Sequence, residues 1–316
     1  MVKWEGKRGT ATGALEKRMQ QNRSSIIFPG DDGPVVIEEV GGKAYSLIRL
    51  CRAGLPVPPG CVLTTTFFEP WSTSLRKTAA WRTFMASERA VPESCAHELH
   101  AHCRDIPFTP AQQKVLKQSL TSLANETGLW AVRSSSPAED LNEASFAGLY
   151  RTEIGVPTAE LEDAIRRVYA SLFEEQVFSY HHGNRRDRRE PHMAVVVQEL
   201  IAADISGIAF SANPVNNSRE EVVINAGWGL GESIVSGRTS PDELVMAKHG
   251  NIILTRKTGE KETALFLHPA DGVREVQGYR SDQFCLDDRD AFVLRDLVLR
   301  VEDLYEDAVD IEWARR

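Results

Sequence analysis

Three segments of the chain place a charged side chain beside glycine or serine residues, a combination that can bind phosphate. Residues 41–43 read Gly-Gly-Lys, residues 133–136 read Arg-Ser-Ser-Ser, and residues 227–232 read Gly-Trp-Gly-Leu-Gly-Glu. In such segments main-chain N–H groups can hold phosphate oxygens while a lysine or arginine neutralises their charge. Each segment alone is weak evidence, because a glycine turn beside a solvated lysine has the same composition. The spacing of the third also differs from the dinucleotide-binding fingerprint.

Apolar stretches beside these segments predict the elements that carry them. Residues 35–37 predict a short strand before the first glycine turn, and the helical spacing of apolar residues over 43–54 predicts a helix after it. Residues 130–133 predict a buried strand that ends at the serines. Further strands are predicted at 61–64, 193–201, 205–210 and 221–226, and helices over most of 66–125 and at 159–180.

The composition is that of a globular protein and restricts its partners. Of the 316 residues, 42% are hydrophobic and 26% are charged, which suits one large α/β unit or two domains. The formal net charge of −8 argues against nucleic acid and anionic membranes as partners, so a positive site must be local. The sequence has no apolar run of about 18 residues that could span a membrane. Its five cysteines, without a C-x-x-C pair, argue against a disulfide framework and indicate a cytoplasmic location.

Two other clusters have simpler interpretations than a binding site. The basic run at 185–189 is typical of a solvated loop. Residues 95–103 read Cys-x-His-x-x-His-x-His-Cys, which offers enough donors for zinc. A helix would turn these donors to different sides, and the usual zinc spacings are absent. We therefore interpret the segment as a half-exposed polar helix.

Five segments, taken together and in this order, resemble the N-terminal ATP-binding domain of the phosphoenolpyruvate synthase and pyruvate phosphate dikinase family, which includes rifampin phosphotransferase. They are residues 41–68, 131–152, 195–214, 224–246 and 310–313, the last of which reads Asp-Ile-Glu-Trp. The resemblance implies an α/β (α+β) ATP-grasp fold, in which two lobes enclose the nucleotide. We accordingly expect a weakly ordered basic leader at 1–30, a first lobe at 31–203 and a second lobe at 204–316.

The resemblance also implies which residues hold the phosphates of ATP. Lys43 matches the family's lysine at the triphosphate, where its ammonium can follow charge as a phosphoryl group leaves. Arg133 matches the arginine whose guanidinium holds phosphate oxygens in a bidentate manner. Ser145 and Gly148 match the flexible loop over the phosphates, where small residues permit close approach of the backbone. Lys43 and Arg133 are thus the expected catalytic residues.

The remaining nucleotide contacts are expected from a strand and from the glycine-rich segment. Gln198, Glu199 and Leu200 match the family's strand between the lobes, where main-chain N–H and C=O groups would read the adenine edge. The same residues also fit a plain core strand, and the two interpretations are compatible. Glu232 matches the acidic residue of the family's glycine-rich segment.

A metal site is expected near the end of the chain. Glu312 matches the family's metal-binding glutamate, and strand alternation puts Asp310 on the same face while Ile311 and Trp313 pack inward. Carboxylates are hard oxygen donors of the kind that Mg²⁺ binds. The expected cofactors are therefore ATP and Mg²⁺.

The resemblance implies partners that this sequence does not contain. In the family, ATP phosphorylates a histidine on a swivelling domain, which carries the group to an acceptor-binding domain. None of the eight histidines lies in a Gly-Gly-x-x-x-His type of motif, and a strand with a Gln-x-Arg pair, expected after residue 313, is missing from the second lobe. We expect an ATP-dependent phosphotransferase domain whose swivelling and acceptor-binding domains act in trans or were removed. Its final acceptor would be a small molecule such as pyruvate or an antibiotic.

Two other functions stay open at this point. One is a stand-alone ATP-dependent kinase or ligase that acts directly on a small molecule, and the other is a non-catalytic nucleotide-binding module. The products distinguish them: AMP with a phosphorylated partner, ADP or an acyl phosphate without a partner, or tight binding without any product.

Overall fold

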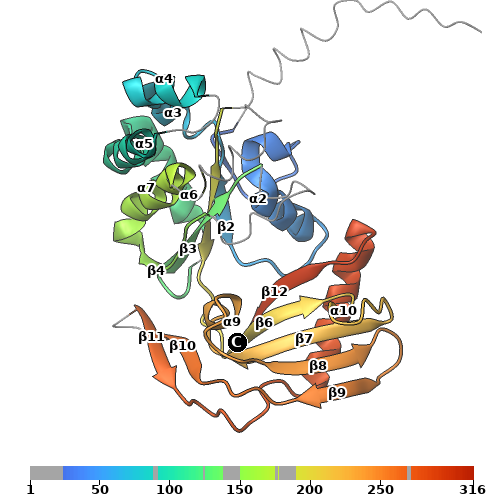
Figure 1. The fold of residues 1–316 in the computed structure, drawn as a ribbon. Coiled ribbons are helices and arrows are strands. Elements are labelled where there is room, and N and C mark those ends of the chain that lie inside the picture. Colours follow the sequence, from blue (N-terminus) through green and yellow to red (C-terminus); the bar gives the residue numbers. More distant parts are fainter. Residues whose placement is uncertain are drawn as a thin grey trace, which may run out of the picture.

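Two five-stranded antiparallel sheets and a two-stranded hairpin make up the β-structure of the described residues (Figure 1). The computed structural model describes residues 24–87, 92–123, 125–137, 150–174, 177, 190–268 and 272–316. Helices accompany both sheets, so the fold is of the α+β class, as the sequence predicted. No helix in these ranges is long and apolar enough to cross a membrane.

The first sheet has helices on both faces, with α2 on one side and the other helices opposite (Figure 1). Its strands, in spatial order, are β1 (Ile26–Ile27), β2 (Gly60–Leu63), β5 (Ala194–Glu199), β3 (Leu129–Ser135) and β4 (Thr152–Pro157). The helices are α2 (Ile37–Arg52), α3 (Glu69–Leu75), α4 (Ala79–Ala86), α5 (Glu93–Asp105), α6 (Pro110–Ser122) and α7 (Leu161–Ala170), with short 3₁₀ turns at Thr158–Glu160 and Ser171–Phe173.

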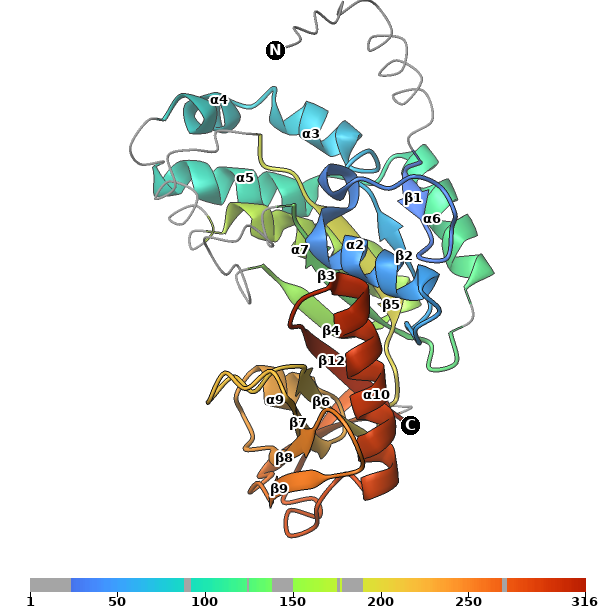
Figure 2. The ribbon, with the colours of Figure 1, turned by 90° about the vertical axis from the view of Figure 1, so that its right-hand side faces the viewer.

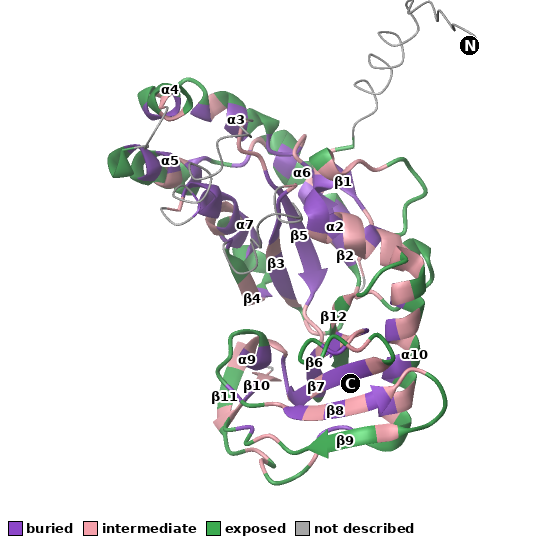
Figure 3. Cartoon of the chain, turned by 45° about the vertical axis from the view of Figure 1, so that its right-hand side comes forward, coloured by how far each residue is buried: buried purple, intermediate pink, exposed green. Residues whose placement is uncertain are grey.

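The central strand β5 is buried along its whole length (Figure 3). Ala194 and Val196 pack with α2, whereas Val195 and Val197 belong to the larger core that α5 and α7 complete. Successive side chains of a strand point to opposite faces, so a continuous run of apolar residues fills both cores. This position in the middle of the sheet explains why residues 193–197 form a continuous apolar run.

The second sheet is covered by a long helix on one face. Its strands, in spatial order, are β12 (Asp310–Arg315), β6 (Ile205–Phe210), β7 (Glu221–Trp228), β8 (Asp242–Ala247) and β9 (Ile253–Lys257). The other elements here are α9 (Glu232–Val235), α10 (Asp288–Tyr305) and the hairpin strands β10 (Thr263–His268) and β11 (Gly272–Gln277). Ala209, Ile224 and Leu244 form a core with Val298 of α10. The opposite face, here called the open face, carries partly buried residues such as Ile208, Asn225 and Glu243 beside the buried Val223.

The prediction of a strand at residues 35–37 is wrong. Ile37 is the first residue of α2, and Val36 caps that helix with extended backbone (φ −116°, ψ 143°). β-Branched residues favour extended backbone, but a strand also needs a partner. The position beside β2 is taken by β1, at Ile26–Ile27. Of the helix predicted at 159–180, α7 covers Leu161–Ala170 and a 3₁₀ turn follows at Ser171–Phe173, while most of residues 175–180 lie outside the described residues. The other predicted strands are present close to their expected positions.

Helix α5 turns the cysteines and histidines of residues 95–103 to different sides. Cys95 and Cys103 are buried in the first core, and His97 is exposed. The Nε2 atom of His102 lies 3.0 Å from the hydroxyl of Ser74. Within the described part of the chain, no three His, Cys, Asp or Glu side chains converge to hold a metal ion.

The buried thiols have raised pKa values. Burial raises the pKa of Cys61 to about 12, and it also raises the pKa of Cys103 and of Cys285. At neutral pH these thiols are protonated, whereas the thiolate is the nucleophilic form of cysteine. The three residues therefore serve packing.

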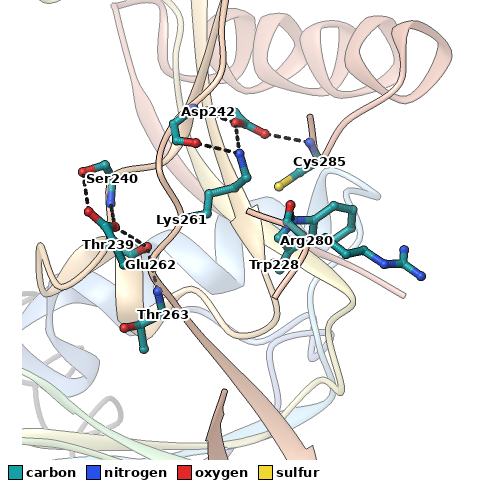
Figure 4. A network of polar contacts seen from close by, with 10 residues as sticks. Trp228, Thr239, Ser240, Asp242, Lys261, Glu262, Thr263, Arg280 and Cys285 are labelled. Atoms are coloured by element: carbon teal, nitrogen blue, oxygen red, sulfur yellow. Dashed lines mark hydrogen bonds and ion pairs between the residues drawn. The ribbon is translucent and has the colours of Figure 1, made fainter. Parts of the chain in front are cut away.

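A buried ion pair fixes the end of the second sheet where β8 begins. The ammonium of Lys261 donates to Oδ1 of Asp242 (Figure 4). It also donates to the carbonyl oxygen of Gly259 at 2.9 Å. Asp242 also accepts from the main-chain N–H groups of Gly259 and Cys285, at 2.8 and 2.6 Å. Lys261 is 2% exposed and Asp242 is fully buried, so one carboxylate ties together three stretches of chain out of contact with water.

Replacing Asp242 should destabilise the protein strongly. We expect Asp242→Ala to lower the free energy of unfolding by about 3–5 kcal/mol, because the Lys261 ammonium would stay buried without a counter-charge. Urea denaturation followed by circular dichroism measures the loss. The double variant Asp242→Ala/Lys261→Met should recover part of it, since no charge is then buried.

The exposed pair of Arg219 and Asp307 provides the control. Their side chains are 73% and 71% exposed, so Arg219→Ala should change the free energy of unfolding by about 1 kcal/mol at most. Equal losses in Asp242→Ala and Arg219→Ala would show that the buried pair does not hold this region.

Candidate phosphate-binding site

The first glycine segment joins helix α2 to the end of strand β3. Gly41 lies inside α2 with φ 73° and ψ 166°, a conformation that essentially only glycine adopts. A side chain there would put its Cβ 2.1 Å from the carbonyl oxygen of Ser135. The Ser135 hydroxyl donates to the carbonyl of Val40 at 2.7 Å and accepts from the N–H of Ala44 at 3.0 Å. Glycine thus allows main chain to pack on main chain at this point.

This close packing brings Lys43 next to the serines of β3. The Lys43 ammonium donates to the carbonyl oxygen of Ser134 at 3.1 Å, and the N–H of Gly42 donates to the carbonyl of Ser136 at 3.2 Å. Lys43 is partly exposed, although the glycines before it are buried. The lysine of one predicted segment and the serines of another therefore lie together.

Arg133, one residue before Ser134, reaches across to the second sheet. Its Nη2 atom donates to Oε2 of Glu312 at 2.7 Å, and the side chains are 29% and 52% exposed. Glu312 is on β12, the edge strand of the second sheet. The structure thus brings together Lys43, Arg133 and Glu312, which are far apart in the sequence.

Strand β12 alternates as the sequence predicted. Asp310 and Glu312 are exposed, whereas Ile311 and Trp313 pack in the core with α10. The two carboxylates therefore lie on the open face of the second sheet. They supply hard oxygen donors of the kind that a divalent cation such as Mg²⁺ takes.

Two polar residues of the open face were missed by the sequence analysis. Glu312 is paired across the strands with Ile208, Ile208 with Asn225, and Asn225 with Glu243. Residues directly opposite each other in an antiparallel sheet point to the same face. Asn225 and Glu243, both partly exposed, thus lie on the same face as Glu312, with Ile208 between Glu312 and Asn225. Only the register of the strands reveals this arrangement.

The segment predicted to read adenine leads from the first sheet to the second. The N–H of Glu199 donates to the carbonyl of Pro59 at 2.8 Å, and the N–H of Leu200 donates to that of Leu129 at 3.1 Å. The Leu200 carbonyl accepts from the hydroxyl of Thr127 at 3.1 Å. A nucleotide that used these main-chain groups would have to replace hydrogen bonds of the chain itself. The Gln198 amide donates to the carbonyl of Pro58 at 3.0 Å.

The linker between the sheets is attached at both ends. Leu200 is bonded to the first sheet through Leu129, and the N–H of Asp204 donates to the carbonyl of Arg315 in β12 at 2.9 Å. The side chain of Ala203 is buried with Leu230 and Leu265. Strand β6 begins directly after it, at Ile205.

The third glycine segment packs against the hairpin. Gly229 has φ 77°, and a Cβ there would lie 2.0 Å from the carbonyl oxygen of Leu265 in β10. The N–H of Leu230 donates to the same oxygen at 2.7 Å. Glu232 begins the four-residue helix α9 and forms an ion pair with Arg238, six residues further along the chain, at 3.9 Å. Ser145 and Gly148 of the predicted phosphate loop lie outside the described residues.

The charges of the site complement a metal–phosphate ligand. Lys43 and Arg133, from the first sheet, offer cationic donors to phosphate oxygens. Asp310 and Glu312, from the second sheet, offer carboxylates to a cation. In the structure the guanidinium of Arg133 and the carboxylate of Glu312 neutralise each other.

Comparison with known proteins gives consistent matches over most of the chain. A family model described as the pyruvate phosphate dikinase AMP/ATP-binding domain matches residues 37–316. Phosphoenolpyruvate synthase of Aeropyrum pernix is 31% identical over 92% of this chain and 40% of that protein. Rifampicin phosphotransferase of a Streptomyces species is 34% identical over 88% of the chain and 33% of that protein. An uncharacterized phosphotransferase of Bacillus subtilis, YvkC, is 33% identical over 86% and 31%. The chain thus spans well under half the length of these relatives.

Substitution of Gly41 tests the packing that positions Lys43. We expect Gly41→Ala to lower the free energy of unfolding by more than about 2 kcal/mol, because both the backbone conformation and the contact with Ser135 exclude a side chain. Urea denaturation measures the loss.

Gly54 is the matched control for this substitution. It has φ 70°, but no atom lies within 4 Å of an added Cβ, so Gly54→Ala should cost only the conformational strain of about 1–2 kcal/mol. If Gly41→Ala is no more damaging than Gly54→Ala, the contact with Ser135 does not constrain the helix.

Proposed function

Because the chain belongs to the pyruvate phosphate dikinase AMP/ATP-binding domain family, we propose that it binds Mg-ATP between its two sheets and transfers a phosphoryl group from it. The contact between Arg133 and Glu312 carries this proposal. It supports a site to which one sheet contributes the phosphate-binding cations and the other the metal-binding carboxylates. We also propose the two ATP-grasp lobes at 31–203 and 204–316, because each five-stranded sheet takes its strands from one side of residue 203. Strand β1 (Ile26–Ile27), which lies in the expected leader, joins the first of these lobes.

Lys43 and Arg133 have different tasks in this proposal. The guanidinium of Arg133 is planar and can bind two phosphate oxygens at once, which orients the phosphate. The ammonium of Lys43 is a compact charge that can follow a transferring phosphoryl group. Phosphoryl transfer depends on such positioning and charge stabilisation. The hydrogen bond from Lys43 to the Ser134 carbonyl keeps the ammonium beside the strand that carries Arg133.

Asp310 and Glu312 fit a magnesium ion, because they are exposed carboxylates on one face of a strand. Mg²⁺, when bound, would neutralise phosphate charge and orient the phosphates. Glu312 would then bind the metal in place of Arg133, while Arg133 binds phosphate in place of Glu312.

This exchange of partners is energetically accessible. Both side chains of the ion pair are partly exposed, and an ion pair of this type contributes about 1 kcal/mol or less. A charge-assisted hydrogen bond to phosphate contributes about 1.5–3 kcal/mol. The phosphate contact therefore outweighs the contact that it replaces.

The remaining nucleotide contacts keep their proposed roles. Gln198, Glu199 and Leu200 would line the adenine, Glu232 would contact the nucleotide from the glycine-rich segment, and Ser145 and Gly148 would cover the phosphates. For Leu200, binding would exchange the hydrogen bonds to Leu129 and Thr127 for bonds to the base.

The proposed acceptor of the phosphoryl group is a histidine on a separate swivelling domain, which passes it to a small molecule held by a third domain. The relatives named phosphoenolpyruvate synthase and rifampicin phosphotransferase support a pyruvate-like or antibiotic acceptor. The length of these relatives supports further domains as partners. We propose the cytoplasm as the location, because all five cysteines are free.

Product analysis tests the proposed reaction. The chain is incubated with Mg-ATP, with and without the histidine domain of a relative, and the nucleotides and proteins are examined. AMP and inorganic phosphate, together with a phosphorylated histidine domain, are the expected products. ADP or an acyl phosphate without that domain would instead indicate a stand-alone kinase or ligase, and tight binding without products would indicate a non-catalytic module.

Substitution of the two cationic residues should weaken nucleotide binding. We expect Lys43→Ala and Arg133→Ala each to raise the Kd for Mg-ATP roughly tenfold or more, because each removes a charge-assisted contact of about 1.5–3 kcal/mol. Titration calorimetry at near-physiological salt measures the Kd.

Arg219→Ala, in an exposed ion pair with Asp307, controls for the loss of one positive charge and should leave the Kd unchanged. If the Kd for Mg-ATP is unaltered in both Lys43→Ala and Arg133→Ala, the proposed phosphate site is wrong.

A further inference from the structure

Two arginines connect helices α2 and α10, which belong to different sheets. Arg49 of α2 donates from Nη2 to the carbonyl oxygen of Leu304, in the last turn of α10, at 3.0 Å. Arg300 of α10 donates to the carbonyl of Gly54, just after the end of α2, at 3.4 Å. Figure 2 shows the C-terminal end of α10 beside α2. Each helix thus has an arginine from the other at its C-terminal end.

Arg49 makes the stronger of these two contacts. Its guanidinium carbon also lies 4.1 Å from the centre of the Tyr305 ring, close enough for a cation–π interaction. The C-terminus of a helix carries partial negative charge, which a basic residue in the last turn commonly stabilises. Helix α10 has no basic residue in its last turn, and its C-cap residue is the acidic Glu306. Arg49 therefore supplies, from the other sheet, the positive charge that α10 itself lacks.

The contact ties α2, which carries Lys43, to the helix that leads into the strand with the proposed metal ligands. On α2, Lys43 precedes Arg49 by less than two turns of the same helix. After Tyr305 the chain reaches Asp310, where β12 begins, and then Glu312. A shift of α10 relative to α2 would therefore move Glu312 relative to Lys43.

We propose that Arg49 is a positioning residue that sets the distance between the metal-binding strand and the phosphate-binding lysine. This inference rests on the proposed function, since it assumes that Lys43 and Glu312 serve one Mg-ATP molecule. Arg49 itself touches neither phosphate nor metal. It acts through the end of α10.

The consequence is specific to metal-dependent binding. Lys43 and Arg133 contact phosphate whether or not a metal is present, whereas Glu312 and Asp310 contribute only through the metal. Loss of Arg49 should therefore weaken binding of Mg-ATP more than binding of ATP in the presence of EDTA. A residue that merely stabilised the fold would affect both affinities alike.

The experiment compares the Kd for ATP in EDTA with the Kd for Mg-ATP, by calorimetry on the full chain. In Arg49→Ala we expect the ratio of the Kd in EDTA to the Kd for Mg-ATP to fall at least threefold relative to the unaltered chain. Arg49→Lys keeps the charge but loses the planar group over the Tyr305 ring, and should give an intermediate ratio. Thermal denaturation monitors folding of each variant.

Arg52→Ala is the matched control on the same helix. Arg52 donates to the carbonyls of Asp31 and Gly33, which belong to the same part of the chain as α2, so its loss should leave the ratio unchanged. Tyr305 offers a second pair of variants. Among the described residues its buried hydroxyl has no hydrogen-bond partner, so Tyr305→Phe should keep the ratio and Tyr305→Leu should lower it.

The outcomes separate this inference from the proposed function. An unchanged ratio in both Arg49→Ala and Tyr305→Leu, or an equal fall in Arg52→Ala, would overturn the positioning role while leaving ATP binding intact. Failure of the unaltered chain to bind ATP in either condition would overturn the proposed function, and the inference with it.

Discussion

The close approach of Gly41 to the main chain of Ser135 constrains everything else at the site. Without a Cβ at this position, helix α2 can lie on the end of β3, and the Ser135 hydroxyl bonds to α2 at both Val40 and Ala44. Lys43 follows on the same turn and therefore comes to lie beside the strand that carries Arg133. Arg133 in turn contacts the second sheet. A single missing side chain thus underlies the convergence of groups from distant parts of the sequence.

Two ion pairs of the chain show that burial determines whether a charged side chain can leave its partner. Lys261 and Asp242 are excluded from water, and each would be left uncompensated if the other moved away. That pair is suited to holding loops in place. Arg133 and Glu312 are partly exposed, so water can compensate either charge while they separate. A site that has to exchange partners on binding a ligand needs a pair of the second kind.

The sequence predicts well those features that depend on short-range patterns. The apolar run of β5 and the alternation of Asp310 and Glu312 follow from the period of a strand, and both are present. The prediction of a strand at 35–37 was wrong because the β-propensity of a short segment does not determine which segment takes the edge position of a sheet. The position of Asn225 and Glu243 on the face of Glu312 depends on strand register, and the packing of Gly229 on Leu265 depends on a hairpin far along the chain. Such information is tertiary, and no local pattern carries it.

The short linker between β5 and β6 limits how the two sheets can move. Its ends are held, at Leu200 by the first sheet and at Asp204 by the second, so large displacement by translation is excluded. The contact of Arg49 with α10 holds the two parts together at a second point. Two fixed points define an axis, and rotation about it is the rigid-body motion that these two attachments alone would leave. The contacts of Arg133 with Glu312 and of Arg300 with Gly54 add to them. A rotation about that axis would displace most the atoms that lie farthest from it.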